Sequence, residues 1–428
     1  MRPGEKRNTH HGRIALFLII AICALSFPSF AVADVAFTTG AGELGIVAAS
    51  RSGGYAVTER AKTFAPGARI FGYNEGKRLL VAEARTGADD RVRIFDTADL
   101  SAPLTDTSWD NARGIRDAVY LRGYLYVVCH DSSNVVKIDT NDHTRKEIEW
   151  IYPHRGVVPA LPAGHSARGT AVVRFGNEIY ALFRIVDGND NYAPSVLVNL
   201  ADDITTLRTL GYVSLPPNTG DLEVLGDHIY AVCPGAGAAN APAQSTIQRV
   251  DPEAMTASGV LRGDEIEREG GRIVGLAFDG GKRAVVTTRK EGGTAAETKF
   301  WLLADLDASS AVCLRTTSAP QASVCYDART KRFCISDFAE GGGGTLHAYD
   351  TSGTATAMDA ETLGGTPRYL AAVRNTPGSD GENPGGEDPG EPGTDSGSGG
   401  GGCTAGASAF LAAVLIASAG RRSRSRRR

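Results

Sequence analysis

The sequence predicts an all-β fold, a β-propeller made of repeated four-stranded blades. Residues 114–150 hold four short runs rich in β-branched, aliphatic and aromatic side chains, which suit strands. The links between these runs are tight turns such as Arg122-Gly123, where glycine can adopt a positive φ. Four strands joined in this way form an antiparallel meander, which needs neighbours because it cannot cover both of its own faces.

The same pattern recurs along the chain. A hydrophobic second strand returns roughly every 50 residues, at residues 79–81, 125–127, 179–181, 229–231, 284–286 and 333–335. The turn before it usually contains glycine, and the third strand often ends on an aspartate, as at Asp96, Asp139, Asp251 and Asp350. A repeat of four strands at this spacing is typical of β-propellers.

The pattern resembles the seven-bladed YVTN-like and NHL-like propellers, which are built from repeats in the manner of WD40 proteins. The resemblance covers residues 34–374 and depends on the repeat pattern, not on a diagnostic motif. It implies the architecture, and it implies no particular activity because propellers serve many functions.

Six complete blades are expected in chain order. They occupy residues 68–109, the segment from there to 150, and residues 165–215, 218–262, 270–317 and 319–363. The strands at 35–39 and 45–59 and a last strand at 368–373 are expected to share a seventh blade. Pairing the two ends of the chain would close the ring and remove its free sheet edges. A six-bladed ring with an N-terminal extension is the alternative.

The N-terminal segment, residues 1–33, has the order of parts of a secretory signal peptide. Four basic residues precede an apolar run at residues 14–25, and Ala31-Val32-Ala33 forms a small-x-small cleavage site. The apolar run is short for a membrane span. An N-terminal membrane anchor is the alternative.

The C-terminal segment has two parts. Residues 375–402 are rich in Gly, Pro, Ser and acidic residues, so we expect a disordered, extended linker. Residues 403–428 contain Cys403, a short apolar run and six arginines. They resemble the Synerg-type C-terminal sorting domain, a relative of the GlyGly and Myxo C-terminal tags. That resemblance implies a sorting protease as partner, delivery to the cell surface and Cys403 as the lipidation or attachment point. An ordinary transmembrane tail anchor is the alternative.

Charge limits the possible partners. The formal net charge is −4, and both terminal segments that we expect to be removed are basic, so the remainder is more acidic. An acidic exported protein argues against nucleic acid or anionic lipid as a partner. The expected location is the cell surface, the outer envelope or the extracellular space, with at least transient anchoring in the membrane by the C-terminal segment.

The cysteines do not form a complete disulfide framework, because five of them, an odd number, fall in the propeller. Cys129 and Cys233 are expected to be buried as small apolar residues. Cys325 and Cys334 flank a turn in the last full blade. If Tyr326 lies opposite Phe333, these two cysteines also face each other and can form a disulfide. Two buried thiols are the alternative.

No sequence motif identifies a cofactor or a catalytic nucleophile, and no cofactor is expected. Residues 40–45 spell G-x-G-x-x-G, but no βαβ unit surrounds them, so they are interpreted as a loop. The oxygen-rich loop with Asp187, Asn189 and Asp190 is a weak calcium candidate. It lacks the distal glutamate of an EF-hand, and a solvated turn is the favoured interpretation.

Candidate binding residues are expected on one face of the ring, where blades are linked and where second strands turn into third strands. The candidates are Arg113, Arg168, His130, Asp131, His154 and His165. The two arginines precede Gly114 and Gly169 in equivalent repeats, so they are expected to point at the mouth of the central channel and to bind an anion. The competing interpretation is that Asp117 or Asp221 neutralises them, and that each candidate satisfies a loop carbonyl.

These observations favour a secreted, surface-anchored propeller that acts as a binding or interaction module for an unknown ligand or surface protein. The rival is a surface hydrolase or lyase at the channel mouth, with metal assistance through His130, His154 or His165. A cluster of titratable residues around one cavity would favour the enzyme. A flat face without such a cluster would favour a binding module.

Overall fold

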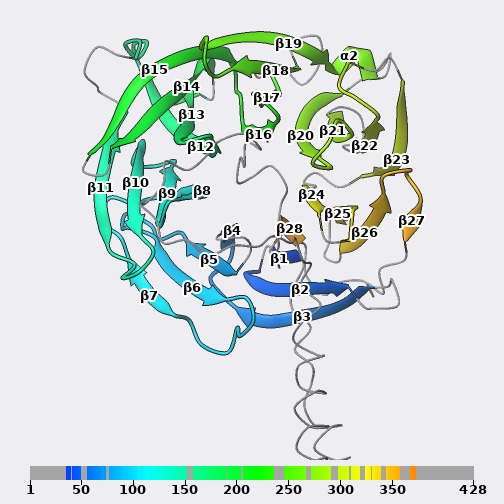
Figure 1. Cartoon of the computed structure of the whole chain (residues 1–428), viewed down its shortest axis with the longest axis horizontal. Helices are drawn as coiled ribbons and strands as arrows, with labels where there is room; N and C mark the ends of the chain where they lie inside the picture. The colour runs from blue at the N-terminus through cyan, green and yellow to red at the C-terminus, as the bar shows by residue number, and fades with distance from the viewer. Residues whose placement is uncertain are drawn as a thin grey trace, which may run out of the picture. The chain divides into compact units, whose positions relative to one another are not determined.

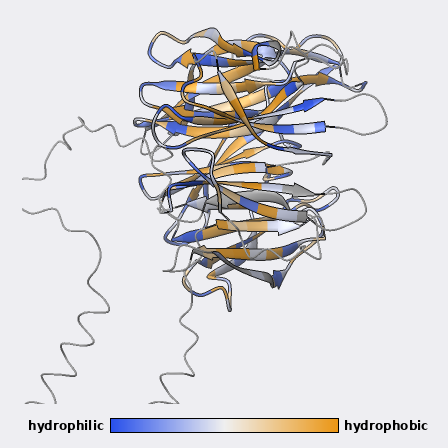
Figure 2. Cartoon of the chain, turned by 90° about the vertical axis from the view of Figure 1, so that its right-hand side faces the viewer, coloured by the Kyte–Doolittle hydropathy of each residue, from blue (hydrophilic) through white to orange (hydrophobic). Residues whose placement is uncertain are grey.

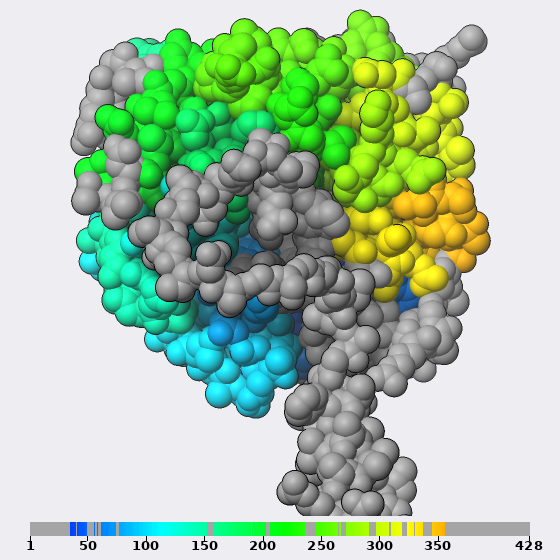
Figure 3. Space-filling view, in the orientation of Figure 1, coloured from blue at the N-terminus to red at the C-terminus, as the bar shows by residue number. Residues whose placement is uncertain are grey.

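The computed structural model confirms a seven-bladed β-propeller, in which seven four-stranded antiparallel sheets follow one another around a ring (Figure 1). It describes residues 35–39, 41–49, 55–73, 77–151, 158–189, 191–203, 206–235, 245–266, 271–290, 297–307, 310–318, 323–328, 330–338, 344–356 and 367–372. The blades succeed one another in chain order around the face shown in Figure 3. The predicted segments 1–33, 375–402 and 403–428, with Cys403, lie outside the described residues.

Blades 1 to 3 each use four strands that are consecutive in the chain. Blade 1 contains β4 (Arg69–Tyr73), β5 (Arg78–Glu83), β6 (Arg91–Asp96) and β7 (Thr105–Ser108). Blade 2 contains β8 (Ile115–Leu121), β9 (Tyr124–Cys129), β10 (Asn134–Asp139) and β11 (Arg145–Trp150). Blade 3 contains β12 (His165–Phe175), β13 (Glu178–Asp187), β14 (Tyr192–Asp203) and β15 (Thr206–Pro217).

Blades 4 to 6 repeat this arrangement. Blade 4 contains β16 (Asp221–Leu225), β17 (His228–Cys233), β18 (Thr246–Asp251) and β19 (Thr256–Arg262), followed by the short helix α2 (Gly263–Ile266). Blade 5 contains β20 (Arg272–Phe278), β21 (Ala284–Lys290), β22 (Glu297–Leu303) and β23 (Ala311–Thr317). Blade 6 contains β24 (Ser323–Asp327), β25 (Arg332–Phe338), β26 (Gly344–Asp350) and β27 (Ala355–Thr356).

The closing blade joins the two ends of the propeller. It contains β1 (Val35–Thr39), β2 (Glu43–Ala49), β3 (Tyr55–Thr63) and β28 (Pro367–Ala372), in the order β28-β1-β2-β3. Strand β28 is the innermost strand and contacts both β24 and β4, so the ring is continuous. The shared seventh blade predicted from the sequence is therefore confirmed, and the six-bladed alternative is excluded. In the described part of the chain, no helix is long and apolar enough to cross a membrane.

The hydrophobic core lies between the blades. Seven clusters of buried side chains are found among the described residues, and each joins two neighbouring blades. Figure 2 shows the hydrophobic positions running along the stacked strands. Large side chains such as Tyr126, Phe183 and Phe300 are fully buried, and each such burial stabilises the fold by roughly 1.5–3 kcal/mol. Blade-to-blade packing thus supplies the cover that a single meander lacks.

Side-chain acceptors hold the start of several innermost strands against the preceding blade. Asp90, just before β6, accepts hydrogen bonds from the backbone amides of Gly114 at 3.0 Å and Ile115 at 2.7 Å. Ser195 does the same for the amide of Thr219 at 3.1 Å, and Ser245 for that of Ile273 at 2.6 Å. These bonds fix the points where the innermost strands begin, and therefore fix the residues that line the ring.

The innermost strands β8, β12 and β20 each carry a β-bulge. The unpaired residue is Arg116 in β8, Thr170 in β12 and Val274 in β20. A bulge breaks the alternation of side chains along a strand and redirects the extra residue. All three bulge residues line the central cavity described below.

The cysteine predictions are confirmed in part. Cys129 and Cys233 are fully buried, as expected. Cys325 lies directly opposite Cys334, in the predicted register. The predicted disulfide, however, is absent, because the structure has both residues as thiols. Cys334 is buried in the cluster between blade 6 and the closing blade, and Cys325 packs against that cluster, so both serve as small apolar side chains.

Candidate functional site

The innermost strands surround a central cavity of about 480 Å³. Its walls come from β4, β8, β12, β16, β20 and β24, with additional residues from β13 and β17. The cavity contains three arginines and three carboxyl groups, Arg69, Arg116, Arg184, Asp117, Asp221 and Glu223, beside apolar and aromatic side chains. A concave site of this size with converging ionisable groups fits a small polar ligand.

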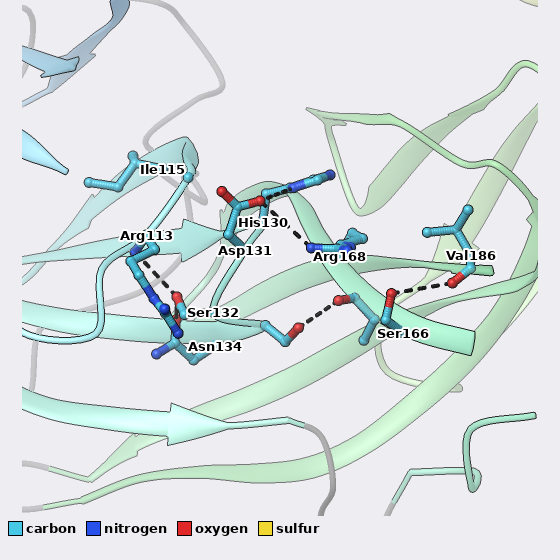
Figure 4. Close-up of polar contacts among 12 residues, drawn as sticks. Arg113, Ile115, His130, Asp131, Ser132, Asn134, Ser166, Arg168 and Val186 are labelled. Carbon is cyan, nitrogen blue, oxygen red and sulfur yellow. Dashed lines mark hydrogen bonds and ion pairs between the residues drawn. The ribbon is translucent and has the colours of Figure 1, made fainter. Parts of the chain in front are cut away.

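A histidine–aspartate pair lies in the loop between the second and third strands of blade 2. His130 Nδ1 is 2.6 Å from Asp131 Oδ1, and Arg168 Nη1 is 3.7 Å from the same oxygen (Figure 4). The sequence predicted that these three residues lie on the same face of the ring, and the structure brings them together. Asp131 therefore orients the imidazole of His130 and pairs with the arginine of the next blade.

Electrostatics keep the His130 imidazole neutral near pH 7. Burial lowers the pKa of His130 most strongly, and the neighbouring Arg116 and Arg168 lower it further, although Asp131 opposes this shift. Burial acts to raise the pKa of Asp131, but the hydrogen bond from His130 and the charges of His130 and Arg116 lower it on balance. Because Asp131 is an ionised acceptor, His130 Nδ1 carries the proton and Nε2 is available as a base.

The carboxyl groups inside the cavity hold their protons more tightly than ordinary carboxyl groups. Burial raises the pKa of Asp117 to about 7, and Asp221 adds to the shift. Burial also raises the pKa of Asp221 to about 6. The pKa of Glu223 lies well above its usual value through burial and the charges of Asp221 and Asp117. Asp117 and Asp221 can therefore exchange protons near neutral pH, as acid–base catalysts do.

The arginines of the cavity are held in place mainly by backbone carbonyls. Arg184 Nε donates to Thr219 O at 3.1 Å, and burial lowers the pKa of Arg184. Arg69 Nη1 lies 3.5 Å from Arg116 O. The Nε atom of Arg116 is buried and has no hydrogen-bond partner within the described residues. An unsatisfied donor on a guanidinium in a cavity is suited to an oxyanion that enters from outside.

The structure does not bring every predicted residue into this group. Arg113 is exposed, does not line the cavity, and extends away from the His130–Asp131 pair in Figure 4. The arginine of this segment that lines the cavity is Arg116, the bulge residue of β8. His165 Nδ1 lies 3.1 Å from the carbonyl of Ala163 in its own loop. His154 lies outside the described residues.

In the loop considered as a weak calcium site, the carboxylate of Asp187 accepts hydrogen bonds from groups of the same loop. Asp187 accepts hydrogen bonds from the amides of Asn189 and Asn191 and from the side chain of Asn191, which is the pattern of a self-contained turn. Asp190 lies outside the described residues. Within the part of the chain that the structure describes, no three His, Cys, Asp or Glu side chains gather closely enough to hold a metal ion.

Sequence reasoning missed Arg69, Arg116 and Glu223 as cavity residues. No sequence pattern indicated that Arg116 faces the cavity, because strict alternation of side chains along β8 does not anticipate a bulge. Glu223 had a usable signal, since it lies two residues after Asp221 on the same strand and therefore on the same face. The competing expectation that Asp117 or Asp221 neutralises Arg168 is not what the structure shows, because Arg168 pairs with Asp131.

Comparison with known proteins identifies the fold. No protein-family model and no curated protein sequence matches the chain. Among solved structures, it is similar to a 6-phosphogluconolactonase described as putative from Bacteroides fragilis, with 10% identity, a TM-score of 0.55, and coverage of 80% of this chain and 98% of the other. It is also similar to the periplasmic gluconolactonase of Pseudomonas aeruginosa, with 13% identity, a TM-score of 0.54, and coverage of 79% and 98%.

A second protein described as a putative 6-phosphogluconolactonase, from Bacteroides uniformis, gives 9% identity and a TM-score of 0.56, over 78% of this chain and 98% of the other. At this level of identity the similarity shows the fold alone. The chain is thus a seven-bladed β-propeller with a charged central cavity, and the three similar structures are described as lactonases of that fold.

Proposed function

We propose that the protein is a hydrolase of a small anionic ester or lactone that binds in the central cavity. The observation that carries this proposal is the His130–Asp131 pair, whose neutral imidazole lies close enough to Arg116 and Arg168 for their charges to lower its pKa. The pair is not among the residues that line the cavity, and Arg116, which does line it, connects the two. A cluster of titratable groups around one cavity was the feature expected to favour an enzyme over a binding module. The similar solved structures, described as lactonases, support the same class of reaction.

The proposed reaction uses His130 as a general base. Its Nε2 accepts a proton from a water molecule while the water oxygen attacks the carbonyl carbon of the ester. The carbonyl oxygen becomes an oxyanion, which the Arg116 guanidinium stabilises. The bond from the carbonyl carbon to the leaving oxygen then breaks, and the imidazolium returns its proton to that oxygen. One water is consumed, and a lactone gives a single hydroxy acid, which releases a proton at neutral pH.

The charges in the cavity determine the class of substrate. Arg69, Arg116 and Arg184 would hold a carboxylate or phosphate group by paired hydrogen bonds. Asp221 and Glu223 would accept hydrogen bonds from hydroxyl groups of the same ligand. A polyhydroxylated acid or its lactone satisfies both sets of groups, whereas an apolar ester satisfies neither.

A binding module without turnover is the second candidate. The unpartnered Nε of Arg116 favours it, because that donor requires an anion but no reaction. A single set of measurements separates the two candidates, since both expect an anion to bind and only one expects proton release.

The test measures proton release from gluconolactone and from 6-phosphogluconolactone by the full-length protein. His130→Gln should reduce kcat by about 100-fold or more, which is the usual effect of losing a general base. His165→Gln is the matched control, because this histidine does not line the central cavity and its Nδ1 lies 3.1 Å from the carbonyl of Ala163. Asp131→Asn should lower kcat. In the wild type, kcat/KM should rise with pH as His130 loses its proton, at a pH below the ordinary pKa of histidine.

Two results would contradict the proposed hydrolase activity. Equal activity in His130→Gln and His165→Gln would show that the pair takes no part in the reaction. Anion binding without accelerated hydrolysis of either lactone, lost on Arg116→Gln, would establish the binding module.

We also propose that the protein is exported and retained at the cell surface through its C-terminal segment, with Cys403 as the attachment point. The support is the order of parts in residues 1–33 and 403–428. The intact mass of protein from the cell envelope tests this: it should begin at Asp34 and lack the arginine-rich end. A chain that still carries Arg428 would contradict the processing, and Cys403→Ala should release the processed protein into the medium.

A further inference from the structure

A second cavity, here called the Glu178 pocket, lies between blades 3 and 4. It measures about 390 Å³ and is lined by Phe175, Glu178, Tyr180, Asn199, Leu210 and Met255, with the β18–β19 turn completing its wall. The turns β12–β13 and β18–β19 contribute to it, so it lies on the opposite face from the starts of the innermost strands. It shares no lining residue with the central cavity.

The polar floor of the Glu178 pocket has a fixed arrangement. Glu178 Oε2 accepts hydrogen bonds from Tyr180 Oη at 2.9 Å and from Asn199 Nδ2 at 2.8 Å. Asn199 Nδ2 also donates to Tyr180 Oη at 3.1 Å. Because a carboxylate oxygen only accepts, the Asn199 atom facing it must be the amide nitrogen. The amide oxygen therefore lies on the other side of the side chain.

That amide oxygen has no partner. Asn199 is 7% exposed, and its Oδ1 atom is buried without a hydrogen-bond donor within the described residues. An unsatisfied buried acceptor costs about 1–3 kcal/mol. Asn199 lines the pocket. A ligand N–H or O–H group that displaces the atoms covering this oxygen would therefore recover the cost.

The charge around the polar floor of the pocket indicates whether the donor group of the ligand is neutral or positively charged. The lining of the Glu178 pocket includes Glu178 and Glu253 and, among the described residues, no basic side chain. Burial raises the pKa of Tyr180 most strongly, and the charges of Glu178 and Asp251 raise it further. The local field is therefore negative, which favours a cation.

The walls of the pocket suit an apolar body next to that cation. Phe175 and Tyr180 pack edge to face with their ring centroids 6.3 Å apart. Leu210 is 45% exposed, although it is a large hydrophobic side chain. Aromatic rings and a methionine thioether contact both apolar groups and ammonium groups favourably.

We propose that the Glu178 pocket binds a primary organic ammonium on an aromatic body. Its N–H groups donate to Asn199 Oδ1 and Glu178, and its ring packs against Phe175, Leu210 and Met255. This site is independent of the hydrolase proposed for the central cavity, since a cation-binding pocket on the other face requires none of the residues used there.

The test is calorimetric titration of the full-length protein with phenethylamine at low salt. Binding is expected, and two matched ligands test its chemistry. The neutral 2-phenylethanol should bind at least tenfold more weakly because it lacks the charge. The trimethylated ammonium should also bind about tenfold more weakly, because it keeps the charge but has no N–H donor.

Variants then locate the site. Glu178→Gln and Asn199→Leu should each weaken phenethylamine binding by about tenfold. Glu265→Gln, which changes an exposed glutamate in α2, should have no effect. The ligand series on the unchanged protein keeps the test valid if Asn199→Leu fails to fold. Absence of phenethylamine binding, equal binding of the amine and the alcohol, or binding that Glu178→Gln leaves unchanged would each overturn the proposal.

Discussion

Replacing Asp117 by Asn tests whether the carboxyl groups of the central cavity are maintained at a cost to stability. Asp117 lines the cavity, and its pKa rises from 3.8 to about 7 through burial and the neighbouring Asp221. Its Oδ2 accepts a hydrogen bond from Val172 N at 2.9 Å, and its Oδ1 accepts one from Ala118 N at 2.8 Å. The side chain therefore links blade 2 to blade 3 while its ionisation is disfavoured.

The magnitude follows from proton linkage. A shift of roughly 3 units corresponds to about 4 kcal/mol, at about 1.4 kcal/mol per unit. Between about pH 4 and pH 7 the folded state binds more protons at Asp117 than the unfolded state does. The free energy of unfolding therefore falls as pH rises through this window, and the loss is complete above about pH 7.

The Asn side chain cannot ionise, so Asp117→Asn should remove this pH dependence. Asn has one acceptor oxygen where the carboxylate has two, and the lost hydrogen bond costs about 1 kcal/mol. The variant should therefore exceed the wild type in unfolding free energy by about 3 kcal/mol near pH 8. Near pH 4.5 the two proteins should agree within about 1 kcal/mol.

Urea unfolding followed by circular dichroism at about pH 4.5 and about pH 8 measures both differences. Asp227→Asn, in the exposed turn between β16 and β17, is the control and should change little at either pH. A difference between Asp117→Asn and wild type that is the same at both pH values would refute a raised pKa at Asp117. It would also remove the argument that the cavity exchanges protons near neutral pH.

Two further predictions follow from close contacts elsewhere. A Cβ atom at Gly220 would lie 2.1 Å from Arg184 Nη2. Gly220→Ala should therefore displace the guanidinium and weaken anion binding in calorimetry, with little change in thermal stability. An unchanged affinity for the anion would contradict a role for Arg184 in binding it. Lys137 Nζ lies 2.5 Å from Asp202 Oδ1 across blades 2 and 3, with side chains only 2% and 6% exposed. Lys137→Met alone should cost about 3–5 kcal/mol in urea unfolding, and adding Asp202→Leu should restore most of it; equal losses in the single and double variants would contradict this.

Much of the fold could be predicted from the sequence because propeller blades are local structures. Each meander is formed by consecutive strands, and turns such as Arg122-Gly123 mark where the strands reverse. The closure of the ring was the simplest expectation, since a lone final strand and the N-terminal strands each lack partners to complete a blade, and they pair in the structure. The register of Cys325 and Cys334 followed from the length of one turn.

The candidate site could be predicted only in outline. His130, Asp131 and Arg168 were found because repeat position places them on one face of the ring, and they interact in the structure. Arg113 was placed at the mouth by the same reasoning, yet its side chain is exposed and lies outside the cavity. Repeat position gives the face on which a residue lies, and it does not give the direction of its side chain.

The sequence by itself determined the repeating meander and its six complete blades, because these depend on hydrophobic periodicity and turn chemistry within about 50 residues. The structure decided between six and seven blades, because the pairing of β1 with β28 joins residues more than 300 positions apart. Only the tertiary structure decided which ionisable groups share the central cavity. Arg116 enters it through a bulge in blade 2, and Arg184 reaches it from β13 of blade 3, the second strand of that blade. Their convergence with Glu223 of blade 4 depends on how neighbouring blades pack, which is set by contacts between residues far apart in the chain.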